Sequence, residues 1–398
     1  MLNVIAREDA VQIVRQFAAL QVSEVQCLPL RKAVGCVLAQ DIVSESAVPP
    51  FDRSTMDGFA VCAADTFGAG ASIPAELRVA GEIKMGEAAA VSLLRGQCAR
   101  ISTGGMLPAG ADAVVMVEHT QDLGDLCLCF GAVAPGENVT KKGDDIAAGS
   151  VVLRRGCVLG AGQIGALASL GIRSVPVFQK PRVAVISTGD ELVQSDPTGG
   201  QICDCNSDLL FAAATNDGCD VFCFGAVKDD RAAIQAAVEA CLARADLVLI
   251  SGGSSAGAKD MTVGILRALG EVHFHGIAMK PGKPTIFGTV GEKLVFGLPG
   301  HPLAAYFVYR TVVYEALRTM LCLPKETPLL RGKLLENIPS NHGREELLCV
   351  RVDENGGVTP LHTKSGILSV LTHAQGYLRI DRNTEGLPKG AEIDIYRL

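Results

Sequence analysis

The stretch that most constrains the fold runs from Arg182 to Glu191 and reads RVAVISTGDE. Its apolar residues, several of them β-branched, are typical of a strand that is buried on both faces of a sheet. The apolar run ends at Ser187, and two carboxylates, Asp190 and Glu191, follow the turn. In open α/β folds, ligands bind at the carboxyl ends of parallel strands. The stretch therefore predicts a buried strand that leads into a ligand site.

Strands and helices alternate along the chain after this first strand. We expect further strands over 221–224, 247–250 and 294–296. The helical spacing of apolar residues predicts helices over 208–215, 230–243 and 303–321. Such alternation favours parallel strands joined by right-handed helical crossovers. The sequence therefore predicts a central α/β domain with a parallel sheet.

A loop of glycine and serine separates the strand over 247–250 from the helix that follows. Its candidate binding residues are Ser251, Gly252, Gly253, Ser255 and Gly257. A strand, a glycine-rich loop and a helix N-terminus together present backbone N–H groups to a phosphate. The loop lacks both the Gly-Lys-Ser/Thr of a Walker A motif and the spacing of the dinucleotide-binding G-x-G-x-x-G motif. It indicates an anion site without identifying the ligand.

Two lysines stand three residues apart in the segment MKPGKP, at Lys280 and Lys283. Two prolines and a glycine stiffen this turn. A rigid pair of ammonium groups suits a bound oxyanion. The segment therefore predicts a second anion-binding element downstream of the glycine-rich loop.

The chain on either side of the α/β segment predicts smaller, β-rich domains. Helices are expected over 10–20 and 162–170, and short strands with frequent glycines over 77–130 and 323–398. Asp57 lies at the mouth of one expected strand. Paired glycines follow Thr103, and such a loop can bring backbone N–H groups close to an anion. Taken alone, an ordinary surface turn is the favoured interpretation of that loop.

Composition argues against several classes of protein. A length of 398 residues predicts two to four domains. A net charge of −7 gives no general attraction for nucleic acid or acidic membranes. The sequence contains no run of about 18 uncharged apolar residues, so it predicts no membrane span. The first residues lack the layout of a signal peptide, so we expect a cytoplasmic protein.

The fourteen cysteines are scattered and form no C-x-x-C pair. In a reducing cytoplasm this pattern favours free buried thiols over a zinc site or a disulfide framework. His273 and His275 lie in an expected strand, and the sequence suggests no third ligand nearby. We therefore interpret them as a structural or surface pair rather than a metal site.

Seven short motifs occur in order along the chain. They are STMDGFA from Ser54, STGGMLPAGAD from Ser102, GDDI from Gly143, STGDEL from Ser187, SGGSSAGAKD from Ser251, KPGKP from Lys280 and GLPGHP from Gly297. This ordered set resembles the molybdopterin molybdenumtransferase family, to which MoeA and the gephyrin E domain belong. The resemblance extends over essentially the whole chain.

The resemblance implies a four-part subunit that forms a homodimer. It implies a discontinuous N-terminal domain over 1–50 and 135–180 and an inserted β-rich domain over 51–134. Residues 181–324 would form the molybdopterin-binding α/β domain, which is related to the molybdopterin adenylyltransferase fold. Residues 325–398 would form a C-terminal β-barrel-like domain.

The resemblance also implies a reaction in molybdenum cofactor biosynthesis. The substrates would be molybdate and adenylylated molybdopterin, which an upstream partner, molybdopterin adenylyltransferase, would supply. A Mg²⁺-dependent step would break the phosphoanhydride, release AMP and leave molybdenum on the dithiolene sulfurs. Glu191 and Asp260 would be the Mg²⁺ ligands, because hard carboxylate oxygens suit this ion.

Further residues match functional positions of the family. Asp57, Asp145 and Asp229 match acidic positions near the cleft and, with Glu191, are the candidate catalytic residues. Because two of them lie outside the α/β domain, we expect a composite site, with a dimer-spanning site as one option. The other matches are Ser251, Gly252, Gly253, Ser255, Gly257 and Thr103 for pterin or phosphate, Asp204 and Asn206 beside the nucleotide or pterin, and Lys280, Lys283, Arg344 and Ser365 for molybdate.

The chain departs from the family pattern at three places. His301 stands where the family commonly has asparagine, and Ala304 replaces a serine. The residues over 255–258 also differ from the usual family motif. The loss of a hydroxyl at Ala304 removes one expected oxyanion donor. These changes leave two alternatives open: a diverged paralogue that prefers another oxyanion such as tungstate or has weakened catalysis, and a non-catalytic scaffold that binds molybdopterin.

Overall fold

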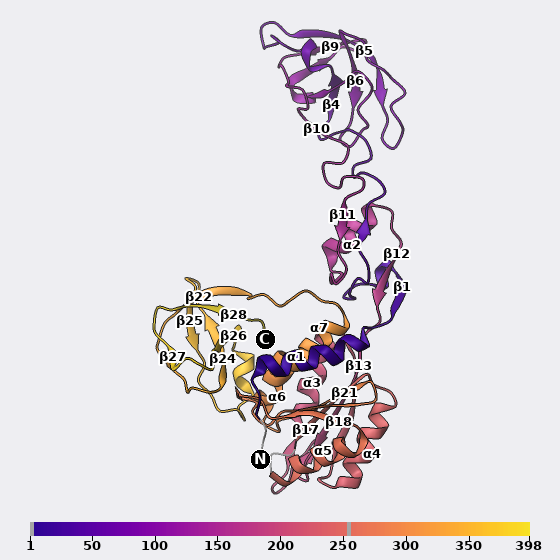
Figure 1. The fold of residues 1–398 in the computed structure, drawn as a ribbon. Coiled ribbons are helices and arrows are strands. Elements are labelled where there is room, and N and C mark those ends of the chain that lie inside the picture. Colours follow the sequence, from indigo (N-terminus) through magenta and orange to yellow (C-terminus); the bar gives the residue numbers. More distant parts are fainter. Residues whose placement is uncertain (1–3, 253–255) are drawn as a thin grey trace.

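The computed structural model describes residues 4–252 and 256–398, except for the side chains over 256–260. The chain is elongated (Figure 1). A β domain from the first third of the sequence stands at one end, and a slender region that contains α2 connects it to the rest. The central α/β domain and the C-terminal β domain lie side by side at the other end.

The central domain is built on a six-stranded sheet with the order β16-β13-β17-β21-β20-β18. The four strands from β16 to β21 run parallel, and β20 is antiparallel to both of its neighbours. The strands are β13 (Arg182–Thr188), β16 (Asp220–Val227), β17 (Leu247–Gly252), β18 (Glu271–His275), β20 (Ile286–Val290) and β21 (Lys293–Leu298). The predicted α/β domain is confirmed.

One strand of this sheet differs from the predicted parallel arrangement. Only Gly291 and Glu292 connect β20 to β21, and Gly291 has a φ of 56°. A two-residue connection can join only antiparallel strands, because a parallel pair needs a crossover of a dozen residues or more. The prediction missed this hairpin, so it did not include the antiparallel β20.

The central strands are buried on both faces, as the apolar run from Arg182 predicted. Along β13, Val183 and Val185 face one core, while Ala184 and Ile186 face the other. Side chains alternate across a strand, so both sets are apolar only where each face of the sheet is covered. The domain is therefore a three-layer sandwich of helices, sheet and helices.

Helices supply the two outer layers. One core includes residues of α1 (Arg7–Ala18), α3 (Cys205–Asn216), α6 (Pro302–Val308) and α7 (Tyr314–Met320). The other includes residues of α4 (Arg231–Leu242) and α5 (Ala256–Leu269). The long helix expected over 303–321 is present, although its middle, Tyr309–Val313, is π-helical. Helix α1 is the first helix of the chain, yet it packs on the central domain rather than on the strands that follow it.

The N-terminal region rises from the central domain as a series of strand pairs. They are β1 (Val25–Pro29) with β12 (Ser174–Phe178), β2 (Ile42–Val43) with β11 (Val151–Leu153), and β3 (Arg53–Ser54) with β10 (Val139–Thr140). Helix α2 (Ala161–Ser169) packs beside them. Each pair joins an outgoing strand to a returning one, so residues 58–129 form an insertion.

The inserted domain is a six-stranded sheet with the order β7-β4-β6-β5-β9-β8. Its strands are β4 (Gly58–Val61), β5 (Ala75–Ile83), β6 (Gln97–Ile101), β7 (Ala113–Met116), β8 (Thr120–Asp122) and β9 (Leu126–Cys129). It has two buried apolar clusters of its own.

The C-terminal domain contains another six-stranded sheet. Its strands are β19 (Met279–Lys280), β22 (Leu330–Leu334), β24 (Glu345–Val352), β25 (Gly357–Pro360), β26 (Gly376–Ile380) and β28 (Glu392–Ile395). Two further pairs are short: β23 (Ile338–Pro339) with β27 (Gly386–Leu387), and β14 (Leu192–Val193) with β15 (Ile202–Cys203) in the central domain. Strand β19 comes from the lysine-containing turn of the central domain, so this turn joins the two domains.

Among the described residues, no helix is both long enough and apolar enough to cross a membrane.

Candidate functional site

The carboxyl ends of β13 and β17 form a tightly packed polar edge. Ser187, Thr188 and Ser251 are buried there. Gly252 has a φ of 138°, and a Cβ added to it would lie 2.2 Å from the carbonyl oxygen of Thr188. Only glycine permits this approach. The conformation at the start of the predicted anion loop is therefore fixed by the neighbouring strand.

Asp204 begins α3 and ties this helix to β13. Its carboxylate accepts a hydrogen bond from the backbone N–H of Ser207 at 3.1 Å, as an N-cap does. It also accepts a hydrogen bond from the hydroxyl of Ser187 at 2.9 Å. Asp204 lies at the predicted edge of the sheet, and these two bonds hold the edge together.

Asn206 joins three elements at the same edge. Its side-chain amide is 8% exposed and donates to the hydroxyl of Ser251 and to the carbonyl oxygen of Gly300, both at 2.8 Å. Helix α3 is thereby connected to the end of β17 and to the loop after β21. The prediction placed Asn206 beside a ligand. In the structure its side-chain NH₂ donates to other residues of the protein.

A group of carboxylates lies at the ends of β13 and β16. The backbone N–H of Asp229 donates to Oδ1 of Asp190 at 3.2 Å. Burial, together with the charges of Asp190 and Glu191, raises the pKa of Asp229. Its Oδ1 atom is buried without a hydrogen-bond partner. These observations describe a place where a cation would relieve electrostatic repulsion.

Some residues of the predicted metal and phosphate site are not among those that the structure describes. Gly253, Ser255 and the side chain of Asp260 lie outside the described residues, and Gly257 lies in the first turn of α5. Among the side chains that the structure describes, no group of three or more His, Cys, Asp or Glu residues is arranged as metal ligands. Glu191 is at the expected edge, and its pairing with Asp260 stays a prediction.

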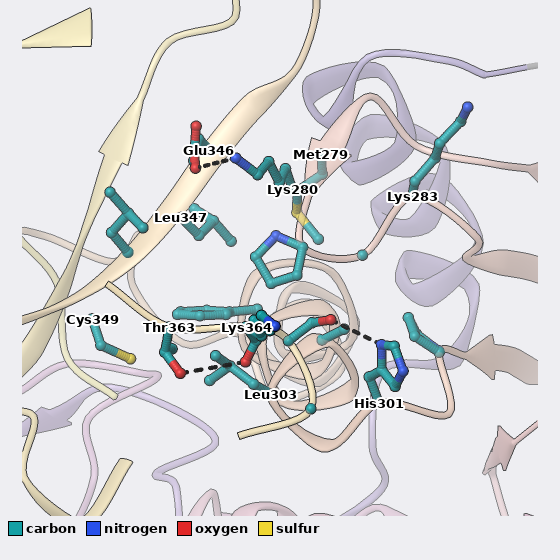
Figure 2. Close-up of a pocket in the computed structure, with 18 of the residues that line it drawn as sticks. Met279, Lys280, Lys283, His301, Leu303, Glu346, Leu347, Cys349, Thr363 and Lys364 are labelled. Atoms are coloured by element: carbon teal, nitrogen blue, oxygen red, sulfur yellow. Dashed lines mark hydrogen bonds and ion pairs between the residues drawn. The ribbon is translucent and has the colours of Figure 1, made fainter. Parts of the chain in front are cut away.

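A pocket of about 770 Å³ opens between the central and C-terminal domains. The four residues predicted for molybdate all line it: Lys280, Lys283, Arg344 and Ser365. Two come from the turn before β20, and two come from the C-terminal domain. Figure 2 shows Lys280 and Lys283 on one turn, with the Lys283 ammonium group directed away from the Lys280 side chain. The structure thus brings together residues that are up to 85 positions apart in the sequence.

Glu346 is a pocket residue that the sequence analysis missed. Its carboxylate lies 2.7 Å from Nζ of Lys280 and accepts a hydrogen bond from the hydroxyl of Ser340 at 2.9 Å. The pairing of β19 with β24 places Lys280 opposite Glu346. Glu346 is only 7% exposed, so its charge faces the lysine rather than bulk water. No motif marks this residue, because strand pairing between domains creates the contact.

His301 and Ala304, the two departures from the family pattern, line the same pocket. The Nδ1 atom of His301 lies 2.8 Å from the hydroxyl oxygen of Ser365, and this hydrogen bond joins the two domains (Figure 2). Lys364 also lines the pocket and adds a positive charge. It is a second residue that the sequence analysis missed, and its position next to Ser365 was the available signal.

Asp57, Thr103 and Asp145 are not brought to this edge within one chain. Asp57 accepts hydrogen bonds from the backbone N–H of Thr103 at 2.7 Å and from its hydroxyl at 3.1 Å. Asp145 is exposed and follows β10. Figure 1 shows the inserted domain and β10 far from β13 and β17. Asp57 and Thr103 therefore contact each other, and the elements that carry them and Asp145 lie far from the sheet edge in the same chain.

The cysteines are free thiols, as predicted, but only part of them are buried. Cys27, Cys203 and Cys223 are exposed, and the Sγ atoms of Cys127 and Cys129 approach only to 3.9 Å. The ring of His273 stacks on Phe17 with 3.9 Å between centroids, and its Nε2 lies 3.0 Å from the hydroxyl of Thr289. His273 therefore packs in the core.

The fold and the site together define a class of protein. An open α/β sheet with a polar carboxyl edge, next to a pocket lined by several positively charged side chains, is an arrangement that suits an anionic ligand. Three family models match the chain in order: "MoeA N-terminal region (domain I and II)" over residues 5–171, "Probable molybdopterin binding domain" over 184–319 and "MoeA C-terminal region (domain IV)" over 331–398. The chain belongs to the MoeA family of molybdopterin molybdenumtransferases.

Individual relatives support this assignment along almost the whole length. The chain is 33% identical to a protein of Mycobacterium tuberculosis named molybdopterin molybdenumtransferase 2, with 93% of this chain and 94% of the relative covered. It is 33% identical to the molybdopterin molybdenumtransferase of Bacillus subtilis, with 94% and 89% covered. The crystal structure of a molybdopterin biosynthesis MoeA protein from Pyrococcus horikoshii superposes with a TM-score of 0.85 at 34% identity and covers 100% of both chains.

Proposed function

We propose that this protein inserts molybdenum from molybdate into adenylylated molybdopterin, in a Mg²⁺-dependent reaction that cleaves the phosphoanhydride and releases AMP. The observation that carries the proposal is that Lys280, Lys283, Arg344 and Ser365 all line one pocket. This pocket lies beside the loop whose Gly300 is bonded to Asn206 at the sheet edge. An oxyanion site and a phosphate-binding edge would thus be neighbours.

The pocket has the charge that a tetrahedral dianion requires. Lys280, Lys283, Arg344 and Lys364 carry positive charge, and Glu346 offsets one of them. Ammonium and guanidinium groups give charge-assisted hydrogen bonds, and a guanidinium can bind two oxygens at once. The ion pair with Glu346 would hold the Lys280 ammonium group in place before the oxyanion arrives.

The carboxylate edge fits the second part of the proposal. Asp229 has a buried oxygen without a hydrogen-bond partner beside Asp190 and Glu191. Mg²⁺ commonly binds one or two carboxylates and completes its shell with water and substrate phosphates, so a preassembled group of three ligands is not needed. Glu191 and Asp229, together with Asp260, would hold the ion, which would neutralise charge on the phosphoanhydride.

The residues of the edge would then have distinct tasks. Asp190 already accepts the backbone N–H of Asp229, so it would position that segment rather than bind the ion. Asp204 and Asn206 would hold the strand ends and the loop at Gly300 in their relative positions. The loop over 251–257 would bind pterin or phosphate through its backbone.

The distant acidic group leads to a proposal about assembly. Asp57, Thr103 and Asp145 are far from the edge in one chain, so they can serve the same reaction only if another copy supplies them. We therefore keep a cytoplasmic homodimer with a composite site as part of the proposed function. A molybdopterin adenylyltransferase would supply the adenylylated substrate.

The test uses the full chain with adenylylated molybdopterin, Mg²⁺ and molybdate, and it follows AMP release and metal insertion. We expect both to depend on Mg²⁺. The Glu191→Ala variant should lose turnover and keep its thermal unfolding temperature. Asp220→Ala is the matched control, because this exposed carboxylate lies at the opposite end of β16 from Asp229.

Each outcome separates the open alternatives. Ligand binding without any metal-dependent AMP release would reject the enzyme and favour a molybdopterin-binding scaffold. Faster insertion with tungstate than with molybdate would favour the diverged paralogue. Wild-type turnover in Glu191→Ala would reject the assignment of that residue.

A further inference from the structure

Ser365 is fixed to the central domain by two contacts. Its carbonyl oxygen accepts a hydrogen bond from the backbone N–H of Leu303 at 3.1 Å. Its hydroxyl oxygen lies 2.8 Å from Nδ1 of His301. His301 occupies the N-cap position of α6, but its side chain makes no cap hydrogen bond. The imidazole instead faces the pocket (Figure 2). The backbone of Ser365 is thus held by Leu303, and the direction of its hydroxyl depends on the ring of His301.

The hydroxyl of Ser365 differs from the neighbouring side chains of Ala304 and Thr363 in its contact with His301. Ala304 lines the pocket, is 4% exposed and has no polar side-chain atom. The hydroxyl of Thr363 is directed to the carbonyl oxygen of Lys364, at 3.4 Å. Among these three side chains, the hydroxyl of Ser365 is the one that His301 can orient.

A hydroxyl group has one proton, so its direction matters to an oxyanion. If Nδ1 of His301 accepts that proton, the oxygen of Ser365 turns its lone pairs toward the pocket and repels the anion. If Nδ1–H donates instead, the proton of Ser365 is free to point at the anion. A bound oxyanion therefore favours the form in which His301 is the donor.

We propose that His301 is a positioning residue of the oxyanion site, which donates from Nδ1 to Ser365 and so directs the Ser365 hydroxyl to the oxyanion. This inference rests on the proposed function, because it takes molybdate as the ligand. The charged groups that line the pocket are Lys280, Lys283, Arg344, Lys364 and Glu346. They supply attraction for the anion, whereas His301 and Ser365 supply a directed hydrogen bond in place of the donor that Ala304 lacks.

The experiment measures the dissociation constant of sodium molybdate by equilibrium dialysis with the full chain. His301→Leu should weaken binding about five- to tenfold, which corresponds to one ordinary hydrogen bond. Ser365→Ala should weaken it by a similar factor. The double variant should be no weaker than either single variant, because both changes remove the same directed bond.

Two conservative variants separate positioning from a general structural effect. His301→Asn places a hydrogen-bonding atom where Nδ1 lies, so it should restore binding to within about twofold of wild type. His301→Gln places its amide nearer the position of Nε2 and should bind as weakly as His301→Leu. This pair carries the test even if the leucine variant fails to fold.

The outcomes distinguish this inference from the proposed function. Unchanged molybdate binding in His301→Gln, or losses that add in the double variant, would overturn the positioning role. Neither result would contradict the proposal that the wild-type protein releases AMP and inserts molybdenum. Absence of molybdate binding in the wild type would overturn both the oxyanion assignment and the inference.

Discussion

Replacing Asn206 with alanine tests whether the sheet edge is held by a single side chain. The amide of Asn206 makes two hydrogen bonds, to Ser251 and to Gly300, and it is almost completely buried. Alanine removes the donor and leaves the carbonyl oxygen of Gly300 without that partner. The loop that leads into His301 would then lose its connection to α3.

The cost follows from these contacts. Each buried hydrogen bond contributes about 1 kcal/mol, and an acceptor left unsatisfied costs about as much again. Asn206→Ala should therefore destabilise the central domain by about 2–3 kcal/mol, which corresponds to roughly 5–10 °C in its unfolding temperature. Asn206→Asp should be at least as harmful at neutral pH, because a carboxylate cannot donate to Gly300.

The assay combines thermal unfolding with hydrogen exchange of the amides around Ser251 and Gly300. Asn216→Ala is the matched control, since Asn216 is exposed at the end of the same helix. It should change stability by less than about 0.5 kcal/mol. Equal stability of the two alanine variants, with unchanged exchange near Gly300, would refute the bracing role of Asn206.

Three more perturbations address other parts of the structure. Glu326 bridges Arg310 of the central domain and Arg379 of the C-terminal domain, at 2.7 and 3.3 Å. Glu326→Ala removes this shared carboxylate and two charge-assisted hydrogen bonds, so it should cost about 3 kcal/mol, as measured by denaturant unfolding. Asp229→Asn should raise the unfolding temperature at pH 7, because the raised pKa of Asp229 makes its ionisation unfavourable in the folded state. Gly252→Ala should reduce both stability and substrate binding, since its Cβ would overlap the neighbouring strand.

Each of these has an outcome that contradicts it. The gain in unfolding temperature from Asp229→Asn should be absent below the ordinary aspartate pKa of 3.8 and should appear as pH rises from there through the raised folded-state pKa of Asp229. A gain that is constant with pH would point to another cause. A Glu326→Ala protein as stable as wild type would show that the interdomain ion pairs contribute little. Normal binding by Gly252→Ala would show that the start of the loop can relax.

Local patterns predicted the elements of the central domain well. The apolar run that became β13 and the helical spacing that became α4 are properties of a few neighbouring residues, and burial on both faces leaves a clear pattern. The antiparallel β20 was missed because a strand's direction depends on its connections. The lysine-containing turn was predicted to bind an anion, but the sequence did not reveal its pairing with β24.

Residue types and motif order in the sequence were sufficient to predict the family and the α/β fold class. The four residues predicted to bind an oxyanion line one pocket, and their role there stays a prediction. The tertiary structure decided what those residues touch. His301 and Ser365 are 64 positions apart, and Asn206 and Gly300 are 94 apart, so their contacts exist only after whole domains have packed. The same packing places Glu346 against Lys280 and leaves Asp57 far from Glu191. Sequence periodicity records local burial, whereas contacts between distant segments depend on the arrangement of all the elements between them.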